Sequence, residues 1–222
     1  MSIKKIKSAV QYHIVKSFMC PKCFSIESIQ ADLYYERNRE DLKPIDISFK
    51  VLCDKCESTE GKTKMIEIDP GIVVYISRIN KAGFETSCSC EGHYKEFDIM
   101  EANVVCILPY VSFNFNNNQQ DKKQKLLDVL NNILELNPIY KDYIFIKENK
   151  INRSEVPEDG DRYDELEVTI YGTWYDVNGN NVLEKSVEDN YIPKITRDNY
   201  FYGKEMFINF LSDICPFYES TL

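Results

Sequence analysis

This sequence contains little histidine, little tryptophan and few glycine-rich loops, and it has no excess of positive charge. Its 222 residues include two histidines and one tryptophan, and they contain no phosphate-binding glycine loop or Walker-type motif. A Ser-His-Asp triad would have to use His13 or His93, and nothing marks a partner serine. The 27 Lys and Arg face 36 Asp and Glu, giving a net charge of −9. This balance argues against a protein that coats nucleic acid, so nucleic acid would bind only through a local basic patch.

Long hydrophobic runs are also missing. The longest charge-free stretch, residues 102–120, contains Pro109 and a run of Asn and Gln that hydrocarbon would not accept, so we expect no membrane span. The stretch after the first lysines is interrupted by Gln11, His13 and Lys16, so it is no signal peptide. We therefore expect a soluble, cytoplasmic protein, in which the eight cysteines would bind metal rather than form disulfides.

The strongest motif is a pair of Cys-x-x-Cys knuckles, Cys20–Cys23 and Cys53–Cys56. Two such knuckles supply four thiolates for a tetrahedral site, so the spacing predicts Zn²⁺ bound by these four cysteines. The 29 residues between the knuckles suffice for two strands, as in a zinc ribbon. Because a four-cysteine site is closed, we expect it to stabilise a module too small to form a large core. The alternative is a redox dithiol or a set of inert thiols.

A second cluster comprises Cys88, Cys90 and His93, within Cys-Ser-Cys-Glu-Gly-His. Three ligands plus water would make an open metal site, which is the type that catalysis requires. Alternatively, Cys90 and His93 would act as nucleophile and base. The third reading is a loop in which Gly92 permits a left-handed turn and the cysteines pack as small apolar residues.

Hydrophobic periodicity predicts an α+β fold: a zinc-ribbon-like module over residues 1–68, then an α+β domain over 69–222 with a mixed sheet and two or three amphipathic helices. The helices are expected at 69–83, with Asp69 as N-cap and Gly83 as C′ residue, at 122–136, and at 198–214. Strands are expected at 28–37, 45–51, 63–68, 84–87, 104–115 (as an edge or bulged strand, because of Pro109), 140–146 and 166–175.

Two further segments have recognisable chemistry. Asn178-Gly179 is a candidate type I′ hairpin turn. Residues 154–165 are acidic and turn-rich, with no EF-hand spacing, so they are expected to form a solvated loop or, alternatively, to dock a basic partner. The aromatic run of Tyr200, Phe201 and Tyr202 is a candidate exposed contact.

The run Ile-Ser-Arg-Ile-Asn-Lys-Ala-Gly-Phe-Glu-Thr at 76–86, followed by Cys90-Glu-Gly-His93, resembles a pattern in small uncharacterised proteins of Firmicutes and their phages. Those proteins begin with two Cys-x-x-Cys knuckles, and the similarity covers about residues 15–115. It implies a zinc-ribbon-like start and brings no established activity. The same segment is faintly similar to the tRNA wybutosine-synthesis methyltransferase family, in which an arginine stands at the position of His93.

Two functions follow as hypotheses. The first is a zinc-stabilised accessory protein, phage-derived in origin, whose acidic surface engages a protein partner such as a host or defence nucleic-acid machine. The second is an enzyme that modifies RNA or a nucleotide and uses the Cys88–His93 segment as its site.

Overall fold

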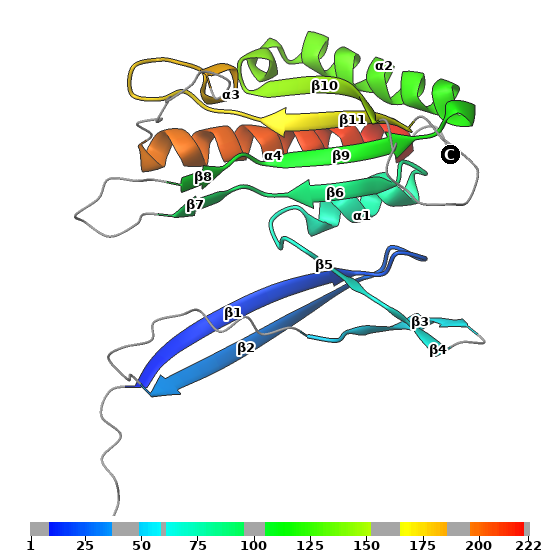
Figure 1. Ribbon diagram of the computed structural model, residues 1–222, viewed down its shortest axis with the longest axis vertical. Helices are drawn as coiled ribbons and strands as arrows, with labels where there is room; N and C mark the ends of the chain where they lie inside the picture. The colour runs from blue at the N-terminus through cyan, green and yellow to red at the C-terminus, as the bar shows by residue number, and fades with distance from the viewer. Residues whose placement is uncertain are drawn as a thin grey trace, which may run out of the picture. The chain divides into compact units, whose positions relative to one another are not determined.

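The computed structural model describes residues 9–36, 49–58, 61–95, 105–151, 165–185 and 196–219 (Figure 1). Its fold is α+β, as predicted. The chain divides into two compact units, residues 1–73 and 74–222, whereas the sequence placed a boundary at 68/69. We call them unit 1 and unit 2 and describe each by itself.

Unit 1 is built on a long antiparallel hairpin. Strands β1 (Ala9–Met19) and β2 (Ile26–Glu36) pair along their full length, and β5 (Ile66–Ile68) adds to the other edge of β1. A second hairpin consists of β3 (Leu52–Ser58) and β4 (Gly61–Lys64). The strand predicted at 63–68 is therefore divided between two sheets, because Met65 leaves the ladder and donates its N–H to the Val51 carbonyl at 2.9 Å.

The strand predicted at 45–51 is not found where the structure can be read. Residues 37–48 lie outside the described part of the chain, and residues 49–51 are not in a strand. Phe49 and Val51 instead pack against a buried cluster of Phe18, Met65 and two cysteines. Among the side chains that the structure describes, this cluster forms the apolar packing around the two knuckles.

Unit 2 contains a four-stranded antiparallel sheet in the order β10-β11-β9-β6. Its strands are β6 (Thr86–Cys90), β9 (Tyr110–Phe115), β10 (Ile144–Ile151) and β11 (Glu165–Gly172). A smaller pair, β7 (His93–Lys95) and β8 (Val105–Ile107), follows β6 and precedes β9. The chain passes from β9 through a helix to β10 while β11 lies between these two strands, which makes a split β-α-β unit.

Pro109 explains why the strand predicted at 104–115 is two strands. It lies between β8 and β9, where it interrupts the ladder because it has no N–H to donate. The expectation of an edge strand is wrong for β9, which pairs with β6 on one side and with β11 on the other. The proline is tolerated because it falls in the break and not in the paired segment.

The predicted helices are all present in unit 2, with altered ends. They are α1 (Val73–Lys81, whose first residue belongs to unit 1), α2 (Gln120–Leu136) and α4 (Arg197–Glu219). The described residues also form a four-residue helix, α3 (Val182–Lys185), and two short 3₁₀ helices, η1 (Asn117–Gln119) and η2 (Pro138–Asp142). Helix α1 begins later than predicted because Asp69 accepts, through its carbonyl, the N–H groups of Ile72 and Val73 in a preceding turn. Gly83 has φ +90°, as expected of a C′ residue.

Helices α2 and α4 contact each other and the sheet, and α4 runs behind it in Figure 1. The core between them consists of fully buried apolar side chains: Val111, Phe113, Val168 and Ile170 from the sheet, and Leu126, Leu130, Phe207, Phe210, Leu211 and Ile214 from the helices. Burial of this extent supplies unit 2 with a hydrophobic core of its own.

The turn at Asn178-Gly179 differs from the predicted type I′. A type I′ turn requires positive φ at both central residues. Of Asn178 and Gly179, only Gly179 has a positive φ, at +78°. The Asp176 carboxylate accepts the N–H groups of Asn178 and Asn180 at 2.8 and 2.9 Å, which holds the backbone before Gly179 in the right-handed region.

Candidate metal centre

The first knuckle is the turn that joins β1 to β2. The Cys20 carbonyl accepts the N–H of Phe24, and the Cys20 N–H donates to the Ser25 carbonyl, both at 2.9 Å. Within this loop the Lys22 N–H points at the Cys20 sulfur, 3.4 Å away. Phe24 closes the turn in the left-handed region, at φ +55°, which is an unfavourable conformation for a residue with a side chain. The turn therefore holds both sulfurs on one side.

The second knuckle lies inside β3 and not in a loop after a strand. The β3–β4 ladder shifts register between Leu52 and Glu57, so the segment with Cys53 and Cys56 bulges out of regular pairing. A bulge of this kind turns side chains away from the normal alternation of a strand. Cys53 becomes almost fully buried, with 1% of its surface exposed, and Cys56 is half-buried.

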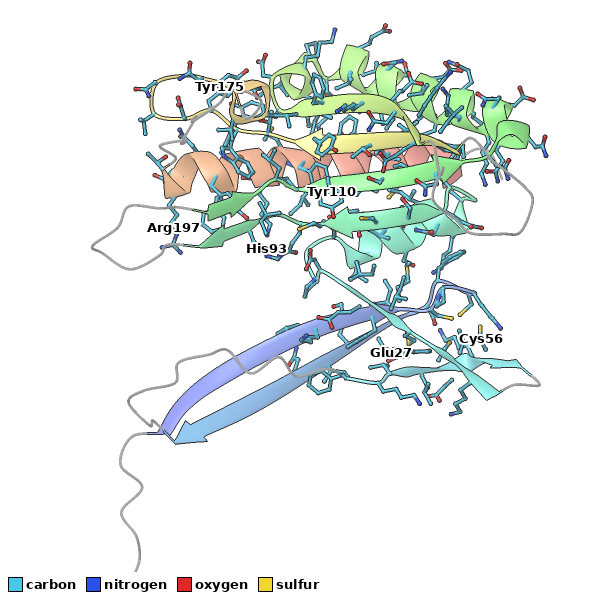
Figure 2. All side chains as sticks on the ribbon, viewed as in Figure 1. Glu27, Cys56, His93, Tyr110, Tyr175 and Arg197 are labelled. Carbon is cyan, nitrogen blue, oxygen red and sulfur yellow. The ribbon has the colours of Figure 1, made fainter. Side chains whose placement is uncertain are left out.

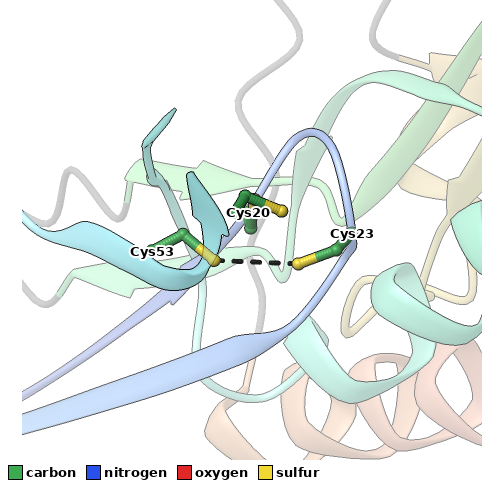
Figure 3. A group of neighbouring side chains, drawn as sticks. Cys20, Cys23 and Cys53 are labelled. Carbon is green, nitrogen blue, oxygen red and sulfur yellow. Dashed lines mark hydrogen bonds between the residues drawn. The ribbon is translucent and has the colours of Figure 1, made fainter. Parts of the chain in front are cut away.

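The two knuckles face each other and bring all four sulfurs within 4.8 Å of one another. Figure 3 shows three of these cysteines, Cys20, Cys23 and Cys53. The Cys23 and Cys53 sulfurs are 3.7 Å apart. Four sulfurs at a Zn–S bond length of about 2.3 Å, placed tetrahedrally, would be separated by about 3.8 Å. The four cysteines named by the sequence can thus hold a metal ion, and their spacing suits a small tetrahedral one.

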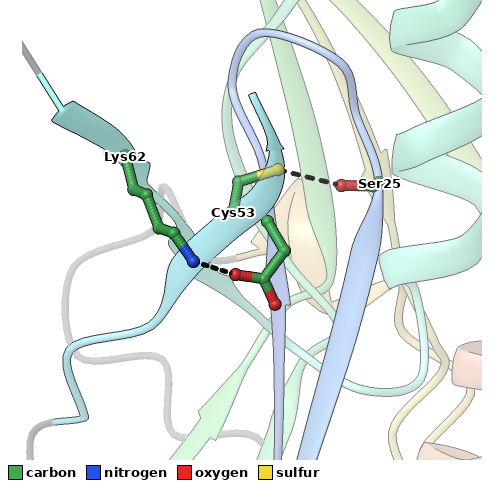
Figure 4. Close-up of polar contacts among 4 residues, drawn as sticks. Ser25, Cys53 and Lys62 are labelled. Carbon is green, nitrogen blue, oxygen red and sulfur yellow. Dashed lines mark hydrogen bonds and ion pairs between the residues drawn. The ribbon is translucent and has the colours of Figure 1, made fainter. Parts of the chain in front are cut away.

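Ser25 is the functional residue that sequence reasoning missed. Its hydroxyl lies 3.2 Å from the Cys23 sulfur and 3.5 Å from the Cys53 sulfur, so it bridges one ligand of each knuckle. Figure 4 shows its contact with Cys53. Hydrogen bonds from Ser25 lower the pKa of Cys23 to about 6 and also lower the pKa of Cys53. In the sequence, this role is indicated only by a hydroxyl side chain two positions after Cys23.

The opposite shift occurs at Cys56. Its hydrogen bond to Cys23, together with burial, raises the pKa of Cys56 to about 12. Neighbouring sulfurs cannot all be ionised without a cation, because like charges at this distance repel. A divalent metal removes that conflict by neutralising the thiolates, so the cluster has the electrostatics of a metal site.

An ion pair between Asp54 and Lys62 joins β3 to β4 just outside the sulfur cluster (Figure 4). It lowers the pKa of Asp54. Both side chains are exposed, so water screens the pair and it contributes little stability. Because this ion pair lies on the surface, we do not count it as part of the candidate site, which the four cysteines form.

In the second cluster Gly92 is left-handed, at φ +82°, as the loop interpretation expects, but the flanking residues belong to strands. Cys88 and Cys90 belong to β6, and His93 begins β7, so only Glu91 and Gly92 separate the strands. The Cys90 sulfur and a ring nitrogen of His93 lie within 4.8 Å of each other. Cys88 belongs to no group of three or more mutually close metal-ligand side chains in the part of the chain that can be described.

The Cys88 thiol instead contacts the Tyr110 hydroxyl at 3.3 Å, on the neighbouring strand β9 (Figure 2 labels Tyr110 and His93). This hydrogen bond and burial raise the pKa of Tyr110 to about 12. Of the three residues that the sequence grouped, the structure brings Cys90 and His93 together and places Cys88 against Tyr110.

The remaining sequence candidates have mixed outcomes. Most of the acidic segment lies outside the described residues; Glu165 and Glu167 belong to β11. Of the aromatic run, Tyr200 is buried at 2% exposure, whereas Phe201 and Tyr202 are exposed at 47% and 43%. The Tyr200 ring packs edge-on against Trp174, which explains its burial.

Comparisons with known proteins add no relative. None of the helices in the described ranges is long and apolar enough to cross a membrane. No family model, no curated protein and no solved structure matches this chain.

Proposed function

We propose that unit 1 is a zinc-ribbon-like module stabilised by Zn²⁺, in an accessory protein whose acidic unit 2 binds a protein partner. The observation that supports this best is the closed set of four sulfurs, two of them buried, within 4.8 Å of one another. Four cysteine ligands fill a tetrahedral zinc shell and leave no position for substrate. A site of this type serves folding rather than catalysis.

The composition of the described core of unit 1 supports a structural role. The buried cluster includes Cys20 and Cys53 themselves, beside Phe18 and Met65. Metal binding joins the β1–β2 turn to β3, two segments that share few other apolar groups. Without the ion, the same cysteines would be a patch of partly ionised thiols in the middle of the unit.

Charge is unevenly divided between the units. Residues 1–73 contain 12 Lys and Arg against 11 Asp and Glu, whereas residues 74–222 contain 15 against 25. The whole acidic excess therefore belongs to unit 2. Such a surface favours a basic partner and disfavours nucleic acid, which is why we propose a protein partner such as a component of a nucleic-acid machine.

Exposed aromatic rings on unit 2 suit a protein contact. Tyr202 and Tyr175 both pack edge-on against Tyr143, at 5.3 and 5.7 Å between ring centres. Phe201 is also exposed on α4, with the Arg197 guanidinium 5.5 Å from its ring centre. Aromatic residues of this kind are enriched among the energetically important residues of interfaces.

Two measurements test this function. Native mass spectrometry of the full chain, purified without chelator, is expected to show bound zinc; a chain without metal would contradict the structural role. Cross-linking in native cell extract at low and high salt is expected to capture a basic protein in a salt-sensitive manner. Tyr202→Ala should weaken the capture, and Phe145→Ala, at another exposed aromatic, is the matched control. Capture that neither salt nor Tyr202→Ala changes would argue against this surface.

The alternative is an RNA- or nucleotide-modifying enzyme, and one observation favours it: the proximity of the Cys90 sulfur and the His93 ring. A thiol and an imidazole at this distance can act as nucleophile and base. The test is turnover of RNA or nucleotide substrates by the wild type and by Cys90→Ser and His93→Ala. Turnover that both folded variants retain would exclude these residues as the site.

A further inference from the structure

The short connection between β6 and β7 repeats the local geometry of the first knuckle. Cys90 and His93 are separated by two residues, as Cys20 and Cys23 are. The Gly92 N–H points at the Cys90 sulfur from 3.4 Å, and the Lys22 N–H points at the Cys20 sulfur from the same distance. A backbone N–H two residues on, directed at a cysteine sulfur, stabilises the thiolate form that metals require.

This Cys-x-x-His turn is held in place from two sides. Gly92 has φ +82°, and a Cβ there would lie 3.0 Å from the Ile107 carbonyl oxygen and 3.1 Å from Pro109. The Glu91 carboxylate pairs with Lys204 of α4 at 2.9 Å, with both side chains 18% exposed. The conformation that brings Cys90 near His93 is therefore set by the surrounding structure, which is the condition for a preorganised ligand pair.

A third ligand is available on the same strand. Cys88 lies two residues before Cys90 on β6, and side chains two apart on a strand point to the same face. Its sulfur reaches the hydroxyl of Tyr110, the residue that pairs with Cys90 across the ladder. Metal binding requires the Cys88 sulfur to turn from Tyr110 toward Cys90. Because Cys88 is exposed and its thiol makes only a weak hydrogen bond, little holds the side chain in its present rotamer.

We propose that Cys88, Cys90 and His93 bind a second divalent ion of the zinc class, in unit 2 and independent of the four-cysteine site. Two thiolates and one imidazole form a ligand set that zinc accepts. Three protein ligands leave the fourth position to water or to a donor atom of a bound molecule. Unit 1 thus has a closed site and unit 2 an open one.

The direct test counts zinc per full-length chain by native mass spectrometry after equilibration with excess zinc and buffer exchange. The wild type is expected to carry two ions, and Cys90→Ser and His93→Asn one each. Ser89→Ala, at the residue between the two cysteines, is the matched control and should keep two. A wild type with a single ion at saturation, or variants that keep two, would overturn the proposal.

A second test needs no substitution and so does not depend on how the variants fold. Zinc is added stepwise to the metal-free wild type, and alkylation by N-ethylmaleimide is mapped cysteine by cysteine. The second equivalent of zinc should slow alkylation of Cys88 and Cys90 at least tenfold. Unchanged alkylation at these two residues sinks the second site, whereas unchanged alkylation at Cys20, Cys23, Cys53 and Cys56 would count against the proposed function instead.

Discussion

Replacement of Cys53 by serine should release the metal and unfold unit 1. Cys53 is 1% exposed, lies 3.7 Å from the Cys23 sulfur, and belongs to a buried cluster of four residues. Structural zinc contributes about 10–16 kcal/mol of apparent binding free energy in small zinc modules at pH 7, and entire domains are stable by only about 5–15 kcal/mol. Loss of one of four thiolates therefore removes an amount comparable with the whole stability of the unit.

Cys215→Ser provides the matched control. Cys215 is also buried, at 3% exposure, but it lies in α4 and donates to the Leu211 carbonyl at 3.4 Å. A serine hydroxyl can make the same bond, so we expect a cost of about 1 kcal/mol and full zinc content. The single tryptophan, Trp174, is buried in unit 2 and reports that unit alone by its fluorescence.

The assay combines zinc content, Trp174 fluorescence and limited proteolysis mapped by mass spectrometry. Cys53→Ser should lose zinc and be cleaved throughout β1–β5 while the tryptophan signal keeps its native unfolding midpoint. If Cys53→Ser kept its zinc, or lost it while β1–β5 stayed as resistant as in Cys215→Ser, the metal would not be what holds unit 1 together.

Further substitutions test the surroundings of both sites. Ser25→Ala removes the side-chain hydrogen bond that contributes most to lowering the pKa of Cys23 to about 6, and it leaves the backbone hydrogen bond of residue 25 in place. The lowered pKa favours the thiolate above about pH 6, and its benefit is lost as the pH falls through that value. Zinc affinity should drop about 10–100-fold, and zinc release on acidification should move to higher pH, as followed with a chromogenic chelator. Gly92→Ala should lower the unfolding midpoint of unit 2 more than Gly83→Ala, because both glycines have positive φ but only at Gly92 would a Cβ meet neighbouring atoms. The backbone strain of a positive φ costs about 1–2 kcal/mol in either variant. Equal effects of the two variants in denaturant titrations would contradict the additional clash at Gly92. Lys204→Met removes the ion pair with Glu91 in the β6–β7 turn and should cost about 1–3 kcal/mol by the same measurement. A change below about 0.5 kcal/mol, typical of an exposed pair, would show that this ion pair does not anchor the turn.

Local patterns in the sequence predicted those features that depend on nearby residues. The spacing of the four cysteines named the cluster, and apolar periodicity found α2 and most of α4. Gly83 was recognised as a helix end because its conformation depends only on the adjacent turn. In each case the physical cause lies within a few residues of the pattern.

Features that depend on distant partners were missed. Nothing local shows that Ser25 reaches Cys53, 28 residues away, or that β9 is paired on both sides. Tyr200 reads like its exposed neighbours, and its burial follows from packing on Trp174. The Asn178-Gly179 turn was given the wrong type because the Asp176 carboxylate, which caps the turn, outweighs the local preference.

Two turns in this chain, one Cys-x-x-Cys and one Cys-x-x-His, have the same spacing but different structural surroundings. In unit 1 the Cys-x-x-Cys turn faces a second pair of cysteines, so four sulfurs lie close enough together to hold a metal ion. In unit 2 the Cys-x-x-His turn follows a strand with one further cysteine and faces Tyr110, which supplies no thiolate. Under the two proposals above, the same spacing gives a closed site where a second knuckle lies opposite the turn, and an open site where a sheet lies opposite it. The two turns differ in the residues that the fold places opposite them. The number of zinc ions per chain therefore distinguishes the proposed closed site from the proposed open site more directly than any property of either turn alone.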